Sequence, residues 1–189
     1  MSRAWIHAAL VCGALFGSVT AAGACSDDGS GGAGGGDPCA DELDADKCFD
    51  YSCVETEPGD VSFKTDILPV FENSCALSSS CHGNDGGLTP AADRPYLGSI
   101  DQMTTPSDVA AIRAAIIGQT AVQSSMLLVD PSHPETSFLM HKMDGDIECA
   151  SLDCVGGDCG TAMPQSSDIL PRETRDLVRA WISQGALDN

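Results

Sequence analysis

Basic residues are scarce in this chain. Lys and Arg together number 9 against 28 Asp and Glu, which gives a formal net charge of −19 at pH 7. A surface of that sign repels the phosphates of nucleic acids and the headgroups of anionic lipids. The composition therefore excludes nucleic acid as a partner and favours basic partner proteins, unless the charge serves solubility alone.

Long apolar runs are missing after the first residues. The start, MSRAWIHAALVCGALFGSVTAAGAC, has Arg3, an apolar run over 5–19 and small residues up to Cys25. This layout is typical of a secretory signal peptide and is too short for a membrane span. Residues 22–24 resemble the lipobox of bacterial lipoproteins, so we expect a signal peptide over 1–24 and lipidation of Cys25, with the lipid as the only membrane anchor. Cleavage that leaves Cys25 as a plain thiol is the alternative.

Common catalytic motifs are also absent. The sequence has no Ser-His-Asp arrangement, no H-E-x-x-H and no phosphate-binding loop.

The cysteines carry more information. The chain has 10, and after Cys12 and Cys25 are set aside eight remain, at 39, 48, 53, 75, 81, 149, 154 and 159. Eight cysteines in an exported chain indicate a disulfide framework and an oxidising compartment.

The spacing of these cysteines limits how they pair. Three lie within residues 39–58 and three within 149–159. If Cys75 and Cys81 hold a cofactor, at least one disulfide must join the two clusters, because each cluster has an odd number. If Cys75 and Cys81 do not hold one, four disulfides are available.

Composition divides the exported part into three segments. A glycine-rich stretch over 25–38 reads as a flexible linker, and 39–58 is acidic and rich in cysteine. The folded domain is expected over 59–189, a size that forms one core.

Helical periodicity appears in three places of this domain. Apolar residues recur at helical spacing over 63–71, where Pro69 bends the helix or marks its start. A second helix is expected over 106–118 with Ser107 as its N-cap, and a third over 171–185. The intervening segments, including the apolar stretch 124–146, read as loops. We expect an all-α domain with long, disulfide-bound loops.

The stretch ENSCALSSSCHG, residues 72–83, ends as a c-type haem attachment site does, with a cysteine followed by a histidine. The usual spacing is C-x-x-C-H. Here Cys75 precedes Cys81 by six positions, which on a helix separates them by about 120° around the axis and ~9 Å along it. Residues 76–80 must therefore bulge out if both thiols are to meet one porphyrin edge. A one-thioether attachment through Cys81 and a small disulfide loop are the alternatives.

A methionine ligand is the common second axial partner of electron-carrying haem. Met163, followed by proline, precedes the last expected helix. This order resembles class I cytochromes c. Three segments, DILPVFENSCALSSSCHG, SHPETSFLMHKMDG and MPQSSDILPRETRDLVRAWISQGA, look like the cytochrome c-like domains of exported proteins and lipoproteins of myxobacteria and planctomycetes.

The resemblance implies a covalent haem c with Cys75 and Cys81 as thioether cysteines. His82 would be the proximal and Met163 the distal ligand of the haem iron. It implies an electron-transfer protein of the cell envelope, lipid-anchored in the periplasm or at the outer membrane, with a redox partner protein at the membrane. An iron with both axial positions filled offers no substrate site, so we do not expect an enzyme. The expected apolar pocket is formed by Phe71, Leu127, Phe138, Leu139 and Trp181.

Two alternatives remain open. The first is a disulfide-stapled envelope lipoprotein that keeps a cytochrome-like domain without haem, with Cys75 and Cys81 bridged, and acts in binding or structure. The second concerns His141, which with Met140 and Met143 has the ligand types of a copper site. No spacing supports that set, and a histidine packed or solvated at a helix end is the competing interpretation.

Overall fold

The computed structural model describes residues 43–54, 59–84, 94–165 and 167–189. All of them belong to one compact unit, Gly36–Asn189. The expected signal peptide over 1–24 and the linker over 25–38, with Cys25, lie outside the described residues. Within the described residues, no helix is both long and apolar enough to cross a membrane.

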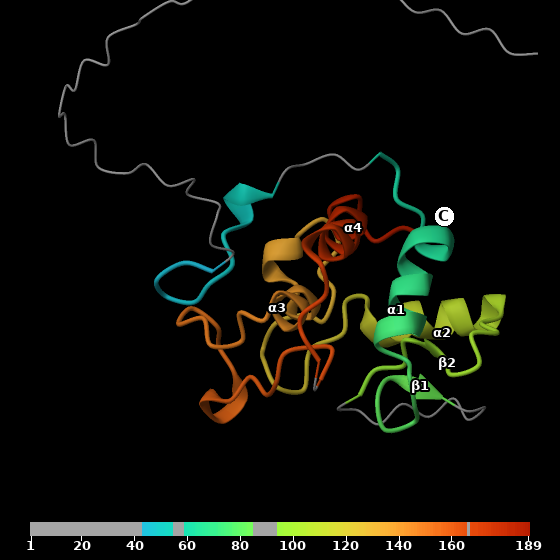
Figure 1. Cartoon of the computed structure of the whole chain (residues 1–189), viewed down its shortest axis with the longest axis horizontal. Coiled ribbons are helices and arrows are strands. Elements are labelled where there is room, and N and C mark those ends of the chain that lie inside the picture. Colours follow the sequence, from blue (N-terminus) through green and yellow to red (C-terminus); the bar gives the residue numbers. More distant parts are fainter. Residues whose placement is uncertain (1–42, 55–58, 85–93, 166) are drawn as a thin grey trace, which may run out of the picture. The chain divides into compact units, whose positions relative to one another are not determined.

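The described part of the chain is helical, as predicted. Its α-helices are α1 (Leu68–Ser74), α2 (Pro106–Ile116), α3 (Phe138–Asp144) and α4 (Arg172–Ser183), and a π-helical turn over Phe63–Ile67 leads into α1. Figure 1 shows α4 above α3, with α1 and α2 on the other side of the molecule. The strands β1 (Gly83–Asn84) and β2 (Gly98–Ser99) form a short parallel pair beside α1 and α2.

Helix α2 begins at Pro106, as predicted, but its N-cap lies two residues before the predicted one. Thr105, and not Ser107, is its N-cap: the Thr105 side chain accepts a hydrogen bond from the Asp108 backbone, and the Asp108 carboxylate accepts one from the Thr105 backbone. Pro106 fits the first helical position because the N–H that it lacks would have no partner there. This reciprocal capping box explains the correction.

Helix α3 lies in the stretch 124–146 that the sequence analysis assigned to a loop. Six of its seven residues are buried: Phe138, Met140, His141, Lys142, Met143 and Asp144. Its His141, Lys142 and Asp144 are buried with polar partners, so polarity does not mark an exposed face and the sequence lacks the amphipathic pattern that reveals surface helices. Gly145 ends it in the left-handed conformation, at φ +75°.

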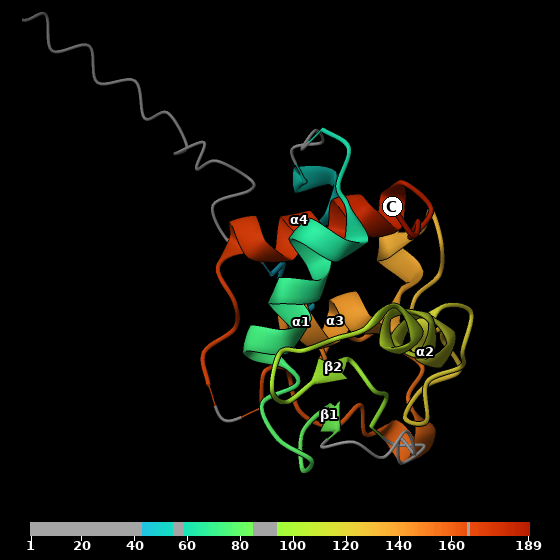
Figure 2. The same cartoon turned by 90° about the vertical axis from the view of Figure 1, so that its right-hand side faces the viewer.

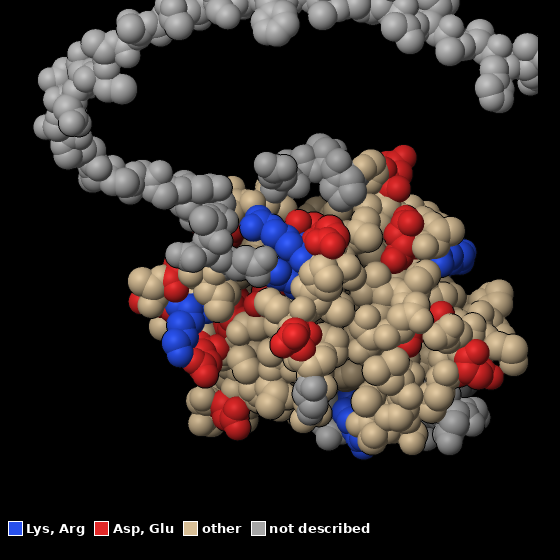
Figure 3. All heavy atoms as spheres, viewed as in Figure 1, with Lys and Arg blue, Asp and Glu red and all other residues tan. Residues whose placement is uncertain are grey.

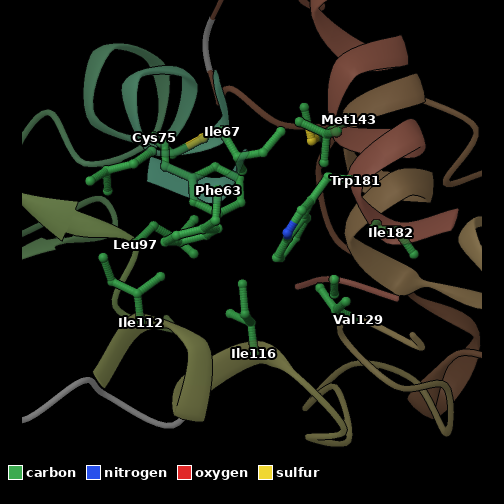
Figure 4. Packing of buried hydrophobic residues seen from close by; sticks show 14 of the residues in the cluster. Phe63, Ile67, Cys75, Leu97, Ile112, Ile116, Val129, Met143, Trp181 and Ile182 are labelled. Atoms are coloured by element: carbon green, nitrogen blue, oxygen red, sulfur yellow. The ribbon is translucent and has the colours of Figure 1, made fainter. Parts of the chain in front are cut away.

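Aromatic side chains fill the centre of the core. The ring of Trp181, from α4, lies 5.3 Å from that of Phe63 and 6.4 Å from that of Phe71, measured between centroids. Ile112 and Ile116 of α2 belong to the same cluster of buried residues, and Figure 4 shows the helices converging on it. The indole of Trp181 also donates a hydrogen bond to the Leu187 carbonyl, which ties the chain end to the core.

Residues 43–54 form a strap that is fastened to α3 and α4. Cys48 forms a disulfide with Cys149, which confirms that a bridge joins the two cysteine clusters. The guanidinium of Arg179 lies 4.3 Å from the centroid of the Phe49 ring. Arg172 donates a hydrogen bond to the carbonyl of Cys53, which is itself disulfide-bonded. Figure 2, turned by 90°, shows the short helix of this strap on the side of α4, away from β1 and β2.

A buried ionic cluster connects helices α3 and α4. The Asp144 carboxylate pairs with Arg175 and Arg179, and all three side chains are almost fully buried. Because an uncompensated buried charge is costly, these pairs fix how α3 lies against α4. Elsewhere the acidic side chains are spread over the surface, as the visible face in Figure 3 shows.

Candidate functional site

The two candidate haem cysteines lie at the ends of a bulged loop after α1. Cys75 caps α1, and its carbonyl accepts a hydrogen bond from the backbone of His82 at 3.1 Å. The Ser78 carbonyl accepts bonds from the backbone of Cys81 and Gly83. Residues 76–80 thus loop out and return, as the spacing required, so that His82 lies next to Cys75.

Both cysteines are free thiols in surroundings that differ. Cys75 is buried at 7% exposure, whereas Cys81 is exposed, and neither is in a disulfide. Burial, together with the neighbouring Cys81, raises the pKa of the Cys75 thiol to about 12. The remaining bridges of the described residues lie elsewhere, Cys154–Cys159 among them.

Glycine at 83 allows the loop to close. A Cβ at this position would lie 2.4 Å from the carbonyl oxygen of Ala76 and 2.7 Å from a side-chain carbon of Ile100. Any other residue would push the β1 strand away from the bulge. Gly83 pairs with Gly98 in the parallel ladder, and this pairing places His82 beside the segment that leads into β2.

The His82 ring is oriented by its own hydrogen bond. Its Nδ1 lies 2.9 Å from the carbonyl oxygen of Pro95, and the His82 carbonyl accepts a bond from the Leu97 backbone. A carbonyl only accepts, so Nδ1 must carry the proton and Nε2 keeps its lone pair for a metal. Burial lowers the pKa of His82, and the charges of Arg94 and Lys142 act in the same direction. The imidazole is thus held in the neutral form that ligates metals.

Met163 reaches the same place from a distant part of the chain. It lies in the loop between α3 and α4, and its backbone N–H donates a hydrogen bond to the Lys142 carbonyl at 2.7 Å. This bond fixes the loop against α3.

Two neighbouring cavities, which share Cys75, His82 and Met163, form the candidate site. The larger, of about 380 Å³, is lined by all four predicted residues, Cys75, Cys81, His82 and Met163. The smaller, of about 80 Å³, is mostly apolar and includes Leu97, Leu128, Phe138, Leu139 and Met143. The structure therefore brings together every residue that the sequence analysis assigned to the cofactor.

The charge of this site differs from that of the chain. Among the described residues, no Asp or Glu lines either cavity, although the chain has 28 acidic residues. The charged residues in the two linings are Arg94 and Lys142. Such a site accepts an anionic cofactor without repulsion between carboxylates.

The expected pocket walls are correct only in part. Phe138 and Leu139 line the smaller cavity, whereas Phe71 and Trp181 lie in the aromatic core and Leu127 lines neither cavity. Sequence reasoning missed Pro95, Leu97, Lys142 and Met143. The stretch LMHKM was a signal for Lys142 and Met143, because it combines polar and sulfur-containing side chains. These two residues line the smaller cavity.

His141 is occupied elsewhere. Its Nδ1 bonds to the buried Asp146 carboxylate at 2.9 Å, and its Nε2 lies 3.2 Å from the carbonyl oxygen of Glu135. This agrees with a packed histidine and leaves no nitrogen for copper. Within the described ranges, no three His, Cys, Asp or Glu side chains are close enough to hold one metal ion directly. The four residues of the larger cavity surround a wider space than a bare ion would require.

Comparisons with protein-family models, with curated proteins and with solved structures found no match to this chain.

Proposed function

We propose that this protein is an electron-transfer protein of the cell envelope that carries a covalent c-type haem. The observation that carries the proposal is the convergence of two free thiols, an oriented imidazole and a thioether on one cavity of about 380 Å³. These groups come from positions 75–82 and 163, and only the folded chain brings them together.

The residues present fit a haem in their chemistry. Cys75 and Cys81 supply the thiols for thioether bonds, His82 offers Nε2, and Met163 offers its sulfur. The smaller cavity is mostly apolar, as a porphyrin ring requires, and no carboxylate of the described residues lines either cavity, which suits the negatively charged propionates. When bound, haem supplies reversible one-electron transfer.

In this function, residues of the chain would ligate the iron and set its reduction potential. His82 and Met163 would hold the haem iron and would leave no coordination position for a substrate, which is why we propose a carrier and not an enzyme. A thioether ligand favours reduced iron and raises the potential. Electrons would pass to a redox partner protein at the membrane, to which lipidated Cys25 would hold this protein.

The haemless alternative required a Cys75–Cys81 disulfide. Both thiols are free in the described structure, even though other cysteines of the chain are bridged. Bridges elsewhere show that the fold accommodates disulfides, while this pair is left reduced beside a cavity. This contrast favours the haem proposal.

The test is expression in a periplasm equipped for cytochrome c maturation, followed by visible spectroscopy of the purified mature protein. We expect a Soret band that survives extraction with acidified acetone, because the haem is covalent. A Cys75→Ser/Cys81→Ser double variant should lose the covalent haem, whereas Ser78→Ala, in the same loop, should keep it. Wild-type protein without a Soret band, or with haem that is fully extractable, would refute the proposal.

A further inference from the structure

We propose that Lys142 is a positioning residue of the haem site: it holds the loop that carries Met163, and its ammonium group raises the reduction potential of the haem. This inference rests on the haem function proposed above. It assigns a role to a buried lysine that neither attaches nor ligates the cofactor.

Hydrogen bonds connect Lys142 to the loop that carries Met163. Its Nζ donates to the carbonyl of Thr161 at 3.0 Å and to that of Cys159. Its own carbonyl accepts the Met163 N–H at 2.7 Å. One residue of α3 therefore binds the loop at three points just before and at the methionine.

The backbone of the loop lies close around the ammonium group of Lys142. Gly160 lies between the two acceptors at φ +73°, and a Cβ there would be 2.9 Å from Nζ of Lys142. A side chain at 160 would both strain the backbone and displace the lysine. The loop thus curves around Nζ at a position where glycine alone fits easily.

Lys142 also brings a buried positive charge to the candidate site. Lys142 is only 8% exposed and lines the smaller cavity together with His82 and Met163. Across the part of the chain that the structure describes, no carboxylate forms an ion pair with it; carbonyl dipoles and the ring of Phe138, 5.2 Å away, surround the ammonium group, and the charge of Asp158 acts on it from beyond ion-pair distance. A buried cation with no carboxylate in contact favours the reduced, less positive state of a nearby electron carrier.

Two variants of the full mature chain, Lys142→Met and Lys142→Arg, distinguish the hydrogen bonds to the loop from the effect of the charge. Lys64→Met is the control. Lys64 is half exposed and pairs with Asp188 at the surface. Three properties are measured: hydrogen exchange of the amides at 159–163 in haem-free protein, the near-infrared band of methionine-ligated iron(III), and the midpoint potential.

For Lys142→Met we expect at least about tenfold faster exchange of these amides, loss of most of the methionine band, and a fall in the midpoint potential by about 59 mV or more, a tenfold change in a one-electron equilibrium. Lys142→Arg, which keeps charge and donors, should retain most of the band and potential. Lys64→Met should behave as wild type.

Unchanged exchange in Lys142→Met would overturn the inference, and so would faster exchange with an unaltered band and potential, since Lys142 would then be merely structural. If Lys142→Met does not fold, Lys142→Gln replaces it, and the same fall in potential is required. A wild-type protein that takes up no haem is a different result: it refutes the proposed function, and this inference falls with it.

Discussion

The Nδ1 atom of His82 lies 2.9 Å from the carbonyl oxygen of Pro95, and this one contact determines which nitrogen of the ring is available. The loop over 76–80 brings the histidine back to Cys75, and the β1–β2 pair holds it beside Pro95. The orientation of the imidazole is therefore a property of the apoprotein, before any cofactor is present.

The pH dependence of stability should reflect His82. Burial lowers its pKa below the ordinary value of 6.5, so the unfolded chain binds the proton more tightly than the folded chain. This contribution to the free energy of unfolding is complete above about pH 6.5 and is lost as the pH falls through the lower, folded-state pKa. Urea unfolding of haem-free protein from about pH 4 to about pH 8 measures it. His82→Gln should flatten the slope and His133→Gln, at an exposed site, should not; equal slopes in all three proteins would contradict the assignment.

The two thiols should differ in reactivity. A pKa of about 12 leaves a thiolate fraction on the order of 10⁻⁴ at pH 8 for Cys75, which is also buried, whereas Cys81 is exposed. Iodoacetamide should therefore modify Cys81 of haem-free protein first, as peptide mass spectrometry would show. In haem-loaded protein neither thiol should react. Equal rates of modification of the two cysteines in the haem-free protein would contradict the burial of Cys75.

Met163→Ala should keep the covalent haem, because attachment depends on the cysteines. It should lose the near-infrared methionine band, bind added imidazole or cyanide, and show a lower reduction potential. Met103→Ala is the control, since Met103 is 72% exposed. If the band persists in Met163→Ala, another methionine ligates the iron and the assignment of Met163 is wrong.

The two described disulfides should contribute unequally to stability. In the chain-entropy account, Cys48–Cys149, with a sequence separation of 101, is worth about 4–5 kcal/mol, and Cys154–Cys159, with a separation of 5, about 2 kcal/mol. Denaturant unfolding of the two double Cys→Ser variants compares them. An equal or reversed order would mean that strain or residual structure outweighs loop entropy.

Sequence reasoning predicted which residues lie together at the candidate site more fully than it predicted the fold around them. Cys75, Cys81, His82 and Met163 are recognisable because their chemistry requires particular residue types in a particular order. Helix α3 escaped because burial on all sides removes its periodicity. Lys142 and Pro95 escaped for another reason: each acts through contacts with segments distant in sequence, which no local pattern encodes.

The strap also determines how the domain would bear a mechanical load. A pull on residues before 48, opposed at the C-terminus, would pass through the Cys48–Cys149 bond; because Cys53 is also disulfide-bonded, the part of the chain left outside the covalent force path runs from 54 to 148. That shielded portion contains Cys75, Cys81 and His82. Met163 lies in the loaded portion, so tension would act on the thioether ligand while the thiols and the imidazole remain unstressed.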